Sequence, residues 1–149
     1  MSWTTEMLVG MRDLVRLYEK MLKQVCTDHH LTVVEAEVVS FLQNNPQKDT
    51  AADIVELRKL SKAAVSKAVE SLIQKSILKR SPDSKDRRKI HLILQTEAAL
   101  VTEQIDAVRE EFLREILFGF TMEELKENEQ FCRRLFENAK KSERKKEES

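Results

Sequence analysis

The chain has 149 residues, a length that suits one domain, and its 26 basic and 26 acidic side chains give a net charge of zero. Only two glycines and two prolines occur, while Ala, Leu, Glu, Lys and Arg supply 72 of the residues, a share typical of long helices. This composition argues against a turn-rich β-sandwich or barrel, and the wide separation of Gly10 and Gly119 excludes a glycine-rich phosphate loop.

The sequence shows no pattern typical of membrane insertion or secretion. No apolar stretch approaches the ~20 residues that span a bilayer, and no basic cluster precedes an apolar run near the N-terminus. The two cysteines, Cys26 and Cys132, are too few and too far apart for a disulfide framework. We therefore expect a protein of the reducing cytoplasm.

Charge is distributed unevenly along the chain. Residues 58–91 hold eleven Lys and Arg against three acidic residues, a net charge of +8, whereas residues 1–57 and 92–131 are acidic, at −4 and −7. A basic segment between acidic neighbours is typical of a surface that binds a polyanion such as nucleic acid. An ordinary solvated face is the alternative, and charge alone does not separate the two.

The N-terminal half of the sequence predicts four helices. Apolar residues recur at three- and four-residue steps through residues 5–28, which predicts a long amphipathic helix. The spacing of Thr32 and Glu35 is that of a capping box and opens a second helix. Thr50 opens a short third helix, and Ser61 can cap a fourth.

The hydrophobic period then changes from 3.6 to about 2, which predicts a hairpin with strands at 77–80 and 90–94 joined by a turn. After the hairpin, Thr96 can cap a long helix that ends near Gly119. A capping box at Thr121 begins the last helix, and the charged tail, residues 140–149, is expected to be disordered.

Together these elements predict a single, mainly α-helical domain with a small β-wing. Residues 31–95 form a winged helix-turn-helix lobe that coincides with the basic segment, and the apolar stripes of residues 5–28 and 97–138 predict dimerisation helices. The lobe contains a recognition helix, residues 61–75, and a wing, residues 77–94. A helix presented in this way fits the major groove of DNA.

On the recognition helix, the inward apolar stripe leaves Lys62, Ala63, Ser66, Lys67 and Glu70 facing outwards. The two lysines can neutralise phosphates, whereas the serine and the alanine are small enough for close contact with base edges. The tip of the wing, residues 85–89, has the charge and reach to follow a minor groove.

Several segments resemble the MarR (multiple-antibiotic-resistance regulator) family of winged helix-turn-helix transcription factors. The matching segments are residues 31–36 at the second helix, residues 60–67 at the recognition helix, and the wing segments 78–80, 83–88 and 90–94. With its flanking helices, the resemblance covers roughly residues 5–138. The chain departs from the family pattern after the recognition helix, where Ser76 replaces a common glycine, and at the exit of the wing, where Leu94 and Gln95 replace a Leu-Thr pair and Ala98 replaces the glycine that follows it.

The resemblance implies a cytoplasmic homodimer whose first and last two helices interlock, with each lobe docking one half of a palindromic operator. We expect a transcriptional repressor, and whether a small-molecule effector releases it stays open. By position, Arg88 corresponds to the family's wing arginine and Asp86 to the acid that holds the wing in shape. The expected DNA-binding residues are Ser61, Lys62, Ala63, Ser66, Lys67, Lys85, Asp86, Arg87, Arg88 and Lys89.

Other functions find less support in the sequence. No local pattern of nucleophile and base is present, so we do not expect an enzyme. A winged-helix adaptor that binds protein instead of DNA is the alternative, and the basic segment argues against it.

A few residues are candidates for metal binding, redox chemistry or ligand binding. Cys26, His29 and His30 lie together and could supply zinc or redox chemistry, but adjacent histidines in a polar turn are usually exposed side chains and no fourth ligand is evident. We therefore expect no metal and no cofactor. Trp3 and Tyr18 could line a ligand cleft, although packing in a core or a dimer interface is the favoured interpretation.

Overall fold

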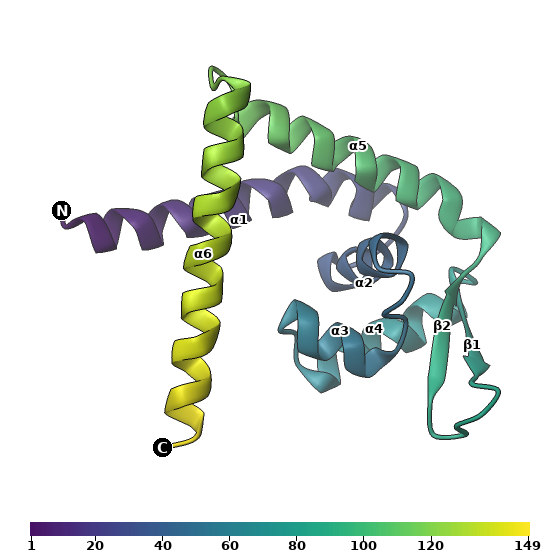
Figure 1. The fold of residues 1–149 in the computed structure, drawn as a ribbon. Coiled ribbons are helices and arrows are strands. Elements are labelled where there is room, and N and C mark those ends of the chain that lie inside the picture. Colours follow the sequence, from purple (N-terminus) through teal and green to yellow (C-terminus); the bar gives the residue numbers. More distant parts are fainter. The chain divides into compact units, whose positions relative to one another are not determined.

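The computed structural model describes residues 1–149 as six α-helices, a short 3₁₀ turn and one two-stranded hairpin (Figure 1). This order confirms the predicted fold class, a mainly α-helical protein with a small β-wing. None of the helices combines the length and the apolar character that a membrane span requires. In chain order the elements are α1 (Trp3–Asp28), α2 (Val33–Asn44), α3 (Ala51–Arg58), α4 (Lys62–Gln74), β1 (Leu78–Pro82), β2 (Ile90–Leu94), η1 (Thr96–Ala98), α5 (Ala99–Ile116) and α6 (Met122–Glu147).

The chain forms two compact units, Met1–Phe112 and Leu113–Ser149, where the sequence predicts a single domain. The boundary falls inside α5. It follows the distribution of buried side chains, because the hydrophobic core and the apolar residues packed against it end at Val108.

The first unit is built around one hydrophobic core. Its largest fully buried side chains come from α1 to α5 and from β1, and include Leu22, Ile54, Leu72, Leu78 and Ile105. Within this unit, α1 and α5 run side by side (Figure 1), and they are joined by an edge-to-face contact between the rings of Tyr18 and Phe112, whose centroids are 5.3 Å apart. The recognition helix α4 packs on α2 and α3, so its position is set by the core.

Four of the predicted helix caps are present. The hydroxyls of Thr32, Thr50, Ser61 and Thr121 each accept a hydrogen bond from a backbone N–H of the first helical turn that follows. At Thr50 and Thr121 the acidic residue three positions later completes the capping box, which satisfies two free donors at each helix start.

The second predicted capping residue of α2 has a different role. Glu35 is only 5% exposed, and its carboxylate accepts a hydrogen bond from Lys75 Nζ at 2.8 Å instead of from the backbone of Thr32. Lys75 also donates to the carbonyl of His30 at 2.6 Å. A buried carboxylate is stabilised far more by a cation than by a peptide N–H, so the tertiary contact replaces the local one.

Three boundaries differ from the sequence prediction. The first strand runs from Leu78 to Pro82, so it begins later and extends further than predicted. Thr96 does not cap α5, because it lies inside η1, and the residue before η1, Gln95, makes no side-chain cap. The tail expected to be disordered is helical through Glu147, since Lys, Arg, Glu and Ala favour helix and three basic residues lie in the last turn, near the negative end of the helix dipole.

Left-handed backbone marks several helix ends. Gly119 has φ of 86° between α5 and α6, as its predicted role as a helix breaker requires, and Ser76 has φ of 62° just after α4. Glycine reaches this conformation without the steric cost that a Cβ imposes. Ser76 therefore occupies, at some cost in free energy, a position that suits glycine better, as expected from the departure noted in the sequence.

The hairpin is attached to the lobe at its base. Strands β1 and β2 are antiparallel, with Leu78 opposite Leu94 and Pro82 opposite Ile90. The N–H of Leu92 donates to the carbonyl of Asp49 at 2.8 Å, which joins β2 to the loop between α2 and α3. The tip beyond Pro82 makes no such backbone bond to the lobe.

Candidate nucleic-acid interface

Helix α4 has the two faces that its sequence predicts. Val65, Ala68, Val69 and Leu72 are buried against the core, whereas the opposite face is open to solvent. The exposed residues of this face include all five recognition-helix candidates, which are Ser61, Lys62, Ala63, Ser66 and Lys67. Ser61 also caps α4, because its Oγ accepts a hydrogen bond from the N–H of Ala64 at 3.1 Å.

Two aspartates build the tip of the wing. Asp83 Oδ2 accepts hydrogen bonds from the backbone N–H groups of Lys85 and Asp86, at 3.0 and 2.9 Å. Asp86 Oδ1 in turn accepts from the N–H of Arg88 at 3.0 Å and lies 3.6 Å from its Nε. Asp86 is thus occupied in shaping the turn, in agreement with the role that the family resemblance implies for it.

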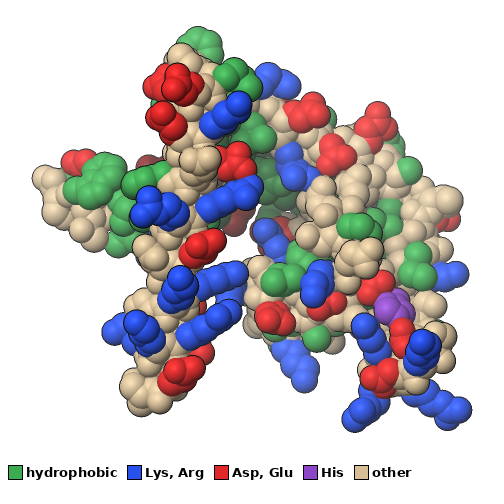
Figure 2. Space-filling model, in the orientation of Figure 1, with side chains coloured by type: hydrophobic (Ala, Val, Ile, Leu, Met, Phe, Trp, Pro, Cys, Tyr) green, Lys and Arg blue, Asp and Glu red, His purple; other side chains and the backbone are tan.

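This turn projects the basic side chains of the wing into solvent. Figure 2 shows Lys and Arg side chains spreading from the tip of the hairpin. The side chain of Arg88 is 94% exposed. Lys85, Arg87 and Lys89 are also exposed, and none of these three has an ion-pair partner, so their charges are available to a polyanion.

Not every cation of the basic segment is free. Lys75 is bound to Glu35, the guanidinium of Arg80 pairs with Glu70, and Arg58 lies 3.7 Å from Glu37. The net charge of the segment therefore overstates what it can offer to a ligand. Lys62 and Lys67 on α4 have no ion-pair partner and remain available beside the wing.

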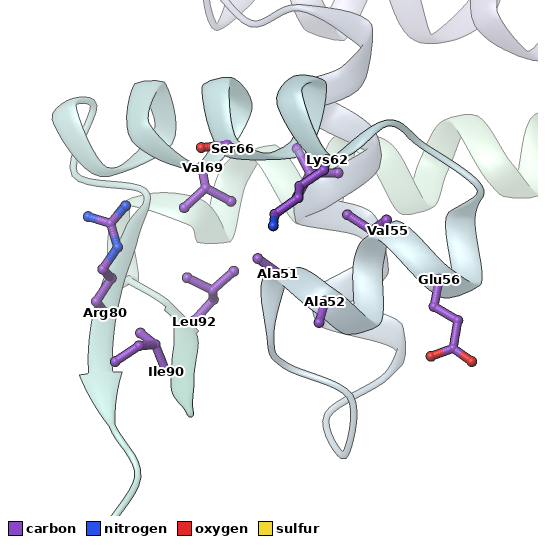
Figure 3. Close-up of a pocket in the computed structure, with 11 residues that line it drawn as sticks. Ala51, Ala52, Val55, Glu56, Lys62, Ser66, Val69, Arg80, Ile90 and Leu92 are labelled. Atoms are coloured by element: carbon purple, nitrogen blue, oxygen red, sulfur yellow. The ribbon is translucent and has the colours of Figure 1, made fainter. Parts of the chain in front are cut away.

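A cavity of about 540 Å³ lies between α3, α4 and the hairpin (Figure 3). Its lining is largely apolar and includes Val55, Val69 and Leu92. Lys62 reaches it from α4 and Arg80, which pairs with Glu70, from β1, and Glu56 of α3 also lines it, so charged side chains flank an apolar surface. The cavity therefore separates the two elements that were expected to contact DNA.

A bridge of side chains beside the wing has no counterpart among the features that the sequence predicts. His91 on β2 lies between two carboxylates, with Nδ1 2.7 Å from Asp49 Oδ1 and Nε2 2.8 Å from Asp83 Oδ1. The hydrogen bond to Asp49 and, second in size, the one to Asp83 raise the pKa of His91. The hydrogen bond from His91 lowers the pKa of Asp83. The spacing of Asp83 and Asp86 is a local sign of a turn, but nothing local relates Asp49 to a histidine 42 positions later.

The residues considered for zinc or redox chemistry have separate partners. Cys26 is buried, with Sγ 3.7 Å from the carbonyl oxygen of Thr32, and burial raises the pKa of its thiol. His29 Nε2 lies 2.8 Å from Gln104 Oε1. No group of three or more His, Cys, Asp or Glu residues is arranged to hold a metal ion.

Outside the lobe, large apolar side chains are exposed in both units. In the first unit most of them lie on the N-terminal half of α1, among them Trp3, Leu8 and Leu14, and Leu100 lies on α5. In the second unit they include Phe118, Phe120, Met122, Phe131 and Phe136. An exposed apolar patch marks a site of association, and these side chains are the candidates for one.

Comparison with known proteins gives one family and many similar folds. Residues 29–89, which span the lobe up to the tip of the wing, match the MarR family. No curated protein matches the sequence.

Three solved structures share the fold over most of the chain. A MarR transcriptional regulator from Methanosarcina mazei Go1 has a TM-score of 0.76 at 16% identity, covering 92% of this chain and 98% of that one. MepR of S. aureus, solved as a DNA complex, has a TM-score of 0.74 at 15% identity, with coverages of 93% and 96%. Bordetella bronchiseptica BpsR, whose DNA binding is regulated by 6-hydroxynicotinic acid, has a TM-score of 0.69 at 20% identity, with coverages of 91% and 96%. Residues 29–89 therefore match the MarR family of transcriptional regulators, and the chain as a whole has the fold of solved proteins of that family.

Proposed function

We propose that this protein is a homodimeric repressor that binds a palindromic DNA operator through α4 and the wing. One observation carries the proposal: unpaired cations are exposed on two neighbouring elements that are built on a single hydrophobic core. These cations are Lys62, Lys67, Lys85, Arg87 and Lys89, beside the highly exposed Arg88. Two such elements on one face suit the adjacent grooves of a DNA duplex.

In this arrangement α4 lies in the major groove. Lys62 and Lys67 contact phosphates on either side, and the small side chains of Ala63 and Ser66 allow the helix to approach the base edges. The hydroxyl of Ser61 already accepts a hydrogen bond from Ala64, but its O–H can still donate to a phosphate.

The wing lies along the minor groove. The guanidinium of Arg88 enters the groove, where a narrow A·T-rich segment offers enhanced negative potential, and Lys85, Arg87 and Lys89 face phosphates. Asp86 acts through the turn and not through DNA, because its carboxylate accepts the N–H of Arg88 and a free carboxylate would be repelled by phosphate.

Association of two chains supplies the second half-site. The exposed apolar faces of α1 and of residues 113–136 are the surfaces that a second copy covers, in an interface of the obligate, apolar kind. A symmetric dimer repeats each contact and therefore requires a palindromic site. The structure of MepR with DNA and the regulation of BpsR by a small acid support DNA as the partner and an effector as the means of release.

The salt dependence of DNA binding tests this proposal. Duplexes that bind the wild-type protein are selected from a randomised pool, and affinity is followed by fluorescence anisotropy at several salt concentrations. Since each phosphate contact releases counterions, log Kd should rise with log salt with a slope of about 0.9 per contacted phosphate. A protein–protein adaptor would yield no enriched duplex and no such slope, which would contradict the proposal.

A further inference from the structure

His91 makes a bridge between the wing and the body of the lobe. Its ring joins Asp49, in the loop between α2 and α3, to Asp83, whose second oxygen organises the tip of the wing. At the base of the hairpin, the backbone bond from Leu92 to Asp49 fixes β2. The histidine bridge is therefore the connection that reaches the turn carrying Arg88.

The geometry of the bridge requires a proton. Both ring nitrogens lie within 2.8 Å of a carboxylate oxygen, and an ionised carboxylate can only accept hydrogen bonds. A neutral imidazole has one N–H, so it can satisfy one aspartate and must turn a lone pair towards the other. Only the imidazolium can donate to Asp49 and Asp83 at the same time.

We propose that His91 is a positioning residue whose bound proton holds the wing in its DNA-binding conformation, so that operator affinity falls when this proton is lost. This inference rests on the proposed function, because DNA binding is its readout. Loss of the proton removes one of the two hydrogen bonds and sets a lone pair against a carboxylate. The turn at Lys85 and Asp86 then loses its side-chain connection to the loop between α2 and α3, while the backbone bond from Leu92 to Asp49 remains.

The surroundings of His91 give the direction of the effect. The charged groups that act on the ring are Asp49, from the loop between α2 and α3, and Asp83, from the wing, and both raise the pKa of His91 above its ordinary value. The bridge is therefore complete below about pH 6.5, the ordinary pKa of histidine, and is lost as the pH rises through the higher pKa of the folded protein. DNA binding should weaken on the alkaline side.

The first test measures affinity for a selected duplex between about pH 6 and pH 9 at constant salt. Wild-type affinity should fall by about tenfold over this range, the size expected for one charge-assisted hydrogen bond. His91→Gln, which cannot carry the proton, should bind weakly throughout with a flat profile. Arg88→Ala should also flatten the profile, because the pH acts through the wing. His30→Asn, the matched control at an exposed histidine with φ of 55°, should keep the wild-type profile.

The second test does not need DNA and holds even where His91→Gln fails to fold. In an NMR titration of the wild-type protein, the backbone amides of Lys85 and Asp86 should shift with the same midpoint as the ring of His91. The proposal would be overturned if the chemical shifts of these wing amides did not change with the titration of His91. A His91→Gln variant that keeps the wild-type pH profile of DNA binding would also overturn it. A protein that binds no DNA at any pH would instead contradict the proposed function, and the titration alone would then decide whether His91 governs the wing.

Discussion

The lobe, residues 31–95, and the C-terminal unit, residues 113–149, differ in where their apolar side chains lie. In the lobe, residues such as Val38, Ile54 and Leu72 are fully buried by their own chain. In residues 113–149 no side chain is buried, and Phe118 is 86% exposed. Apolar surface gains stability when it is buried, so the lobe has a core of its own, whereas residues 113–149 hold apolar surface that the proposed dimer would bury.

Placing charge on the exposed apolar side chains of α6 is the most severe test of this comparison. Phe131→Asp combined with Phe136→Asp should abolish the dimer, because burying two unpaired carboxylates costs far more than the interface regains. Sedimentation equilibrium at micromolar concentration should show a dimer for wild type and for the control Gln130→Asp. A folded wild-type monomer of 17.4 kDa, or an intact dimer for the double variant, would show that this face has no partner.

A mutation that creates a new cavity in the core of the lobe should have a large effect on the free energy of unfolding. Leu72 has no exposed surface, so Leu72→Ala should lower the free energy of unfolding by about 2–5 kcal/mol. Leu57 lies on α3 and is 47% exposed, so Leu57→Ala should cost less than about 1 kcal/mol. Urea titration at a fixed protein concentration measures both, and equal losses would mean that the lobe is not the self-sufficient unit.

Within the lobe, the wing and the recognition helix should differ in how they lose affinity. Arg88→Ala should weaken binding by about 1–3 kcal/mol per half-site, more on A·T-rich than on G·C-rich flanks, because the minor groove is narrower there. Lys67→Ala should weaken all sequences about equally and reduce the salt slope by about one per contact. Fluorescence anisotropy on matched duplexes measures the affinity of both variants. If both variants fold and keep the wild-type affinity and salt slope, the basic segment is an ordinary solvated surface.

The smallest expected effect concerns the end of α4. Ser76→Gly should stabilise the protein by about 0.5–1 kcal/mol, because φ of 62° suits glycine and strains a residue with a Cβ. Ser71→Gly, inside the same helix, should instead destabilise it. Thermal unfolding of the two variants should move in opposite directions, and a lower melting temperature for Ser76→Gly would show that the strain is not relieved.

The features that the sequence predicted correctly are those that depend on residues close together in the chain. Helix caps at Thr50 and Thr121, the change of hydrophobic period at the hairpin and the two faces of α4 depend on neighbours three or four positions away. The turn at the tip of the wing is also local, since Asp86 accepts from the N–H of the residue two positions later, and the family resemblance added the role of Asp86.

The features that the sequence did not predict join distant segments. Glu35 and Lys75 are 40 positions apart, and burial of the carboxylate, which no local pattern reveals, gives it a cation in place of its capping role. His91 and Asp49 meet only because β2 pairs with the loop before α3. The remaining error, the helical tail, arose because a run of charge suggests disorder although the same residues favour helix.

A footprint of the protein–DNA complex tests the central claim most directly. Hydroxyl-radical cleavage of a selected duplex, combined with the mass of the complex, reports where the protein lies and how many chains bind. We predict two chains per duplex and two protected half-sites centred about one helical turn, ~10 bp, apart, as a symmetric dimer with one recognition helix per lobe requires. One chain per duplex, or protection without two-fold symmetry, would contradict the account.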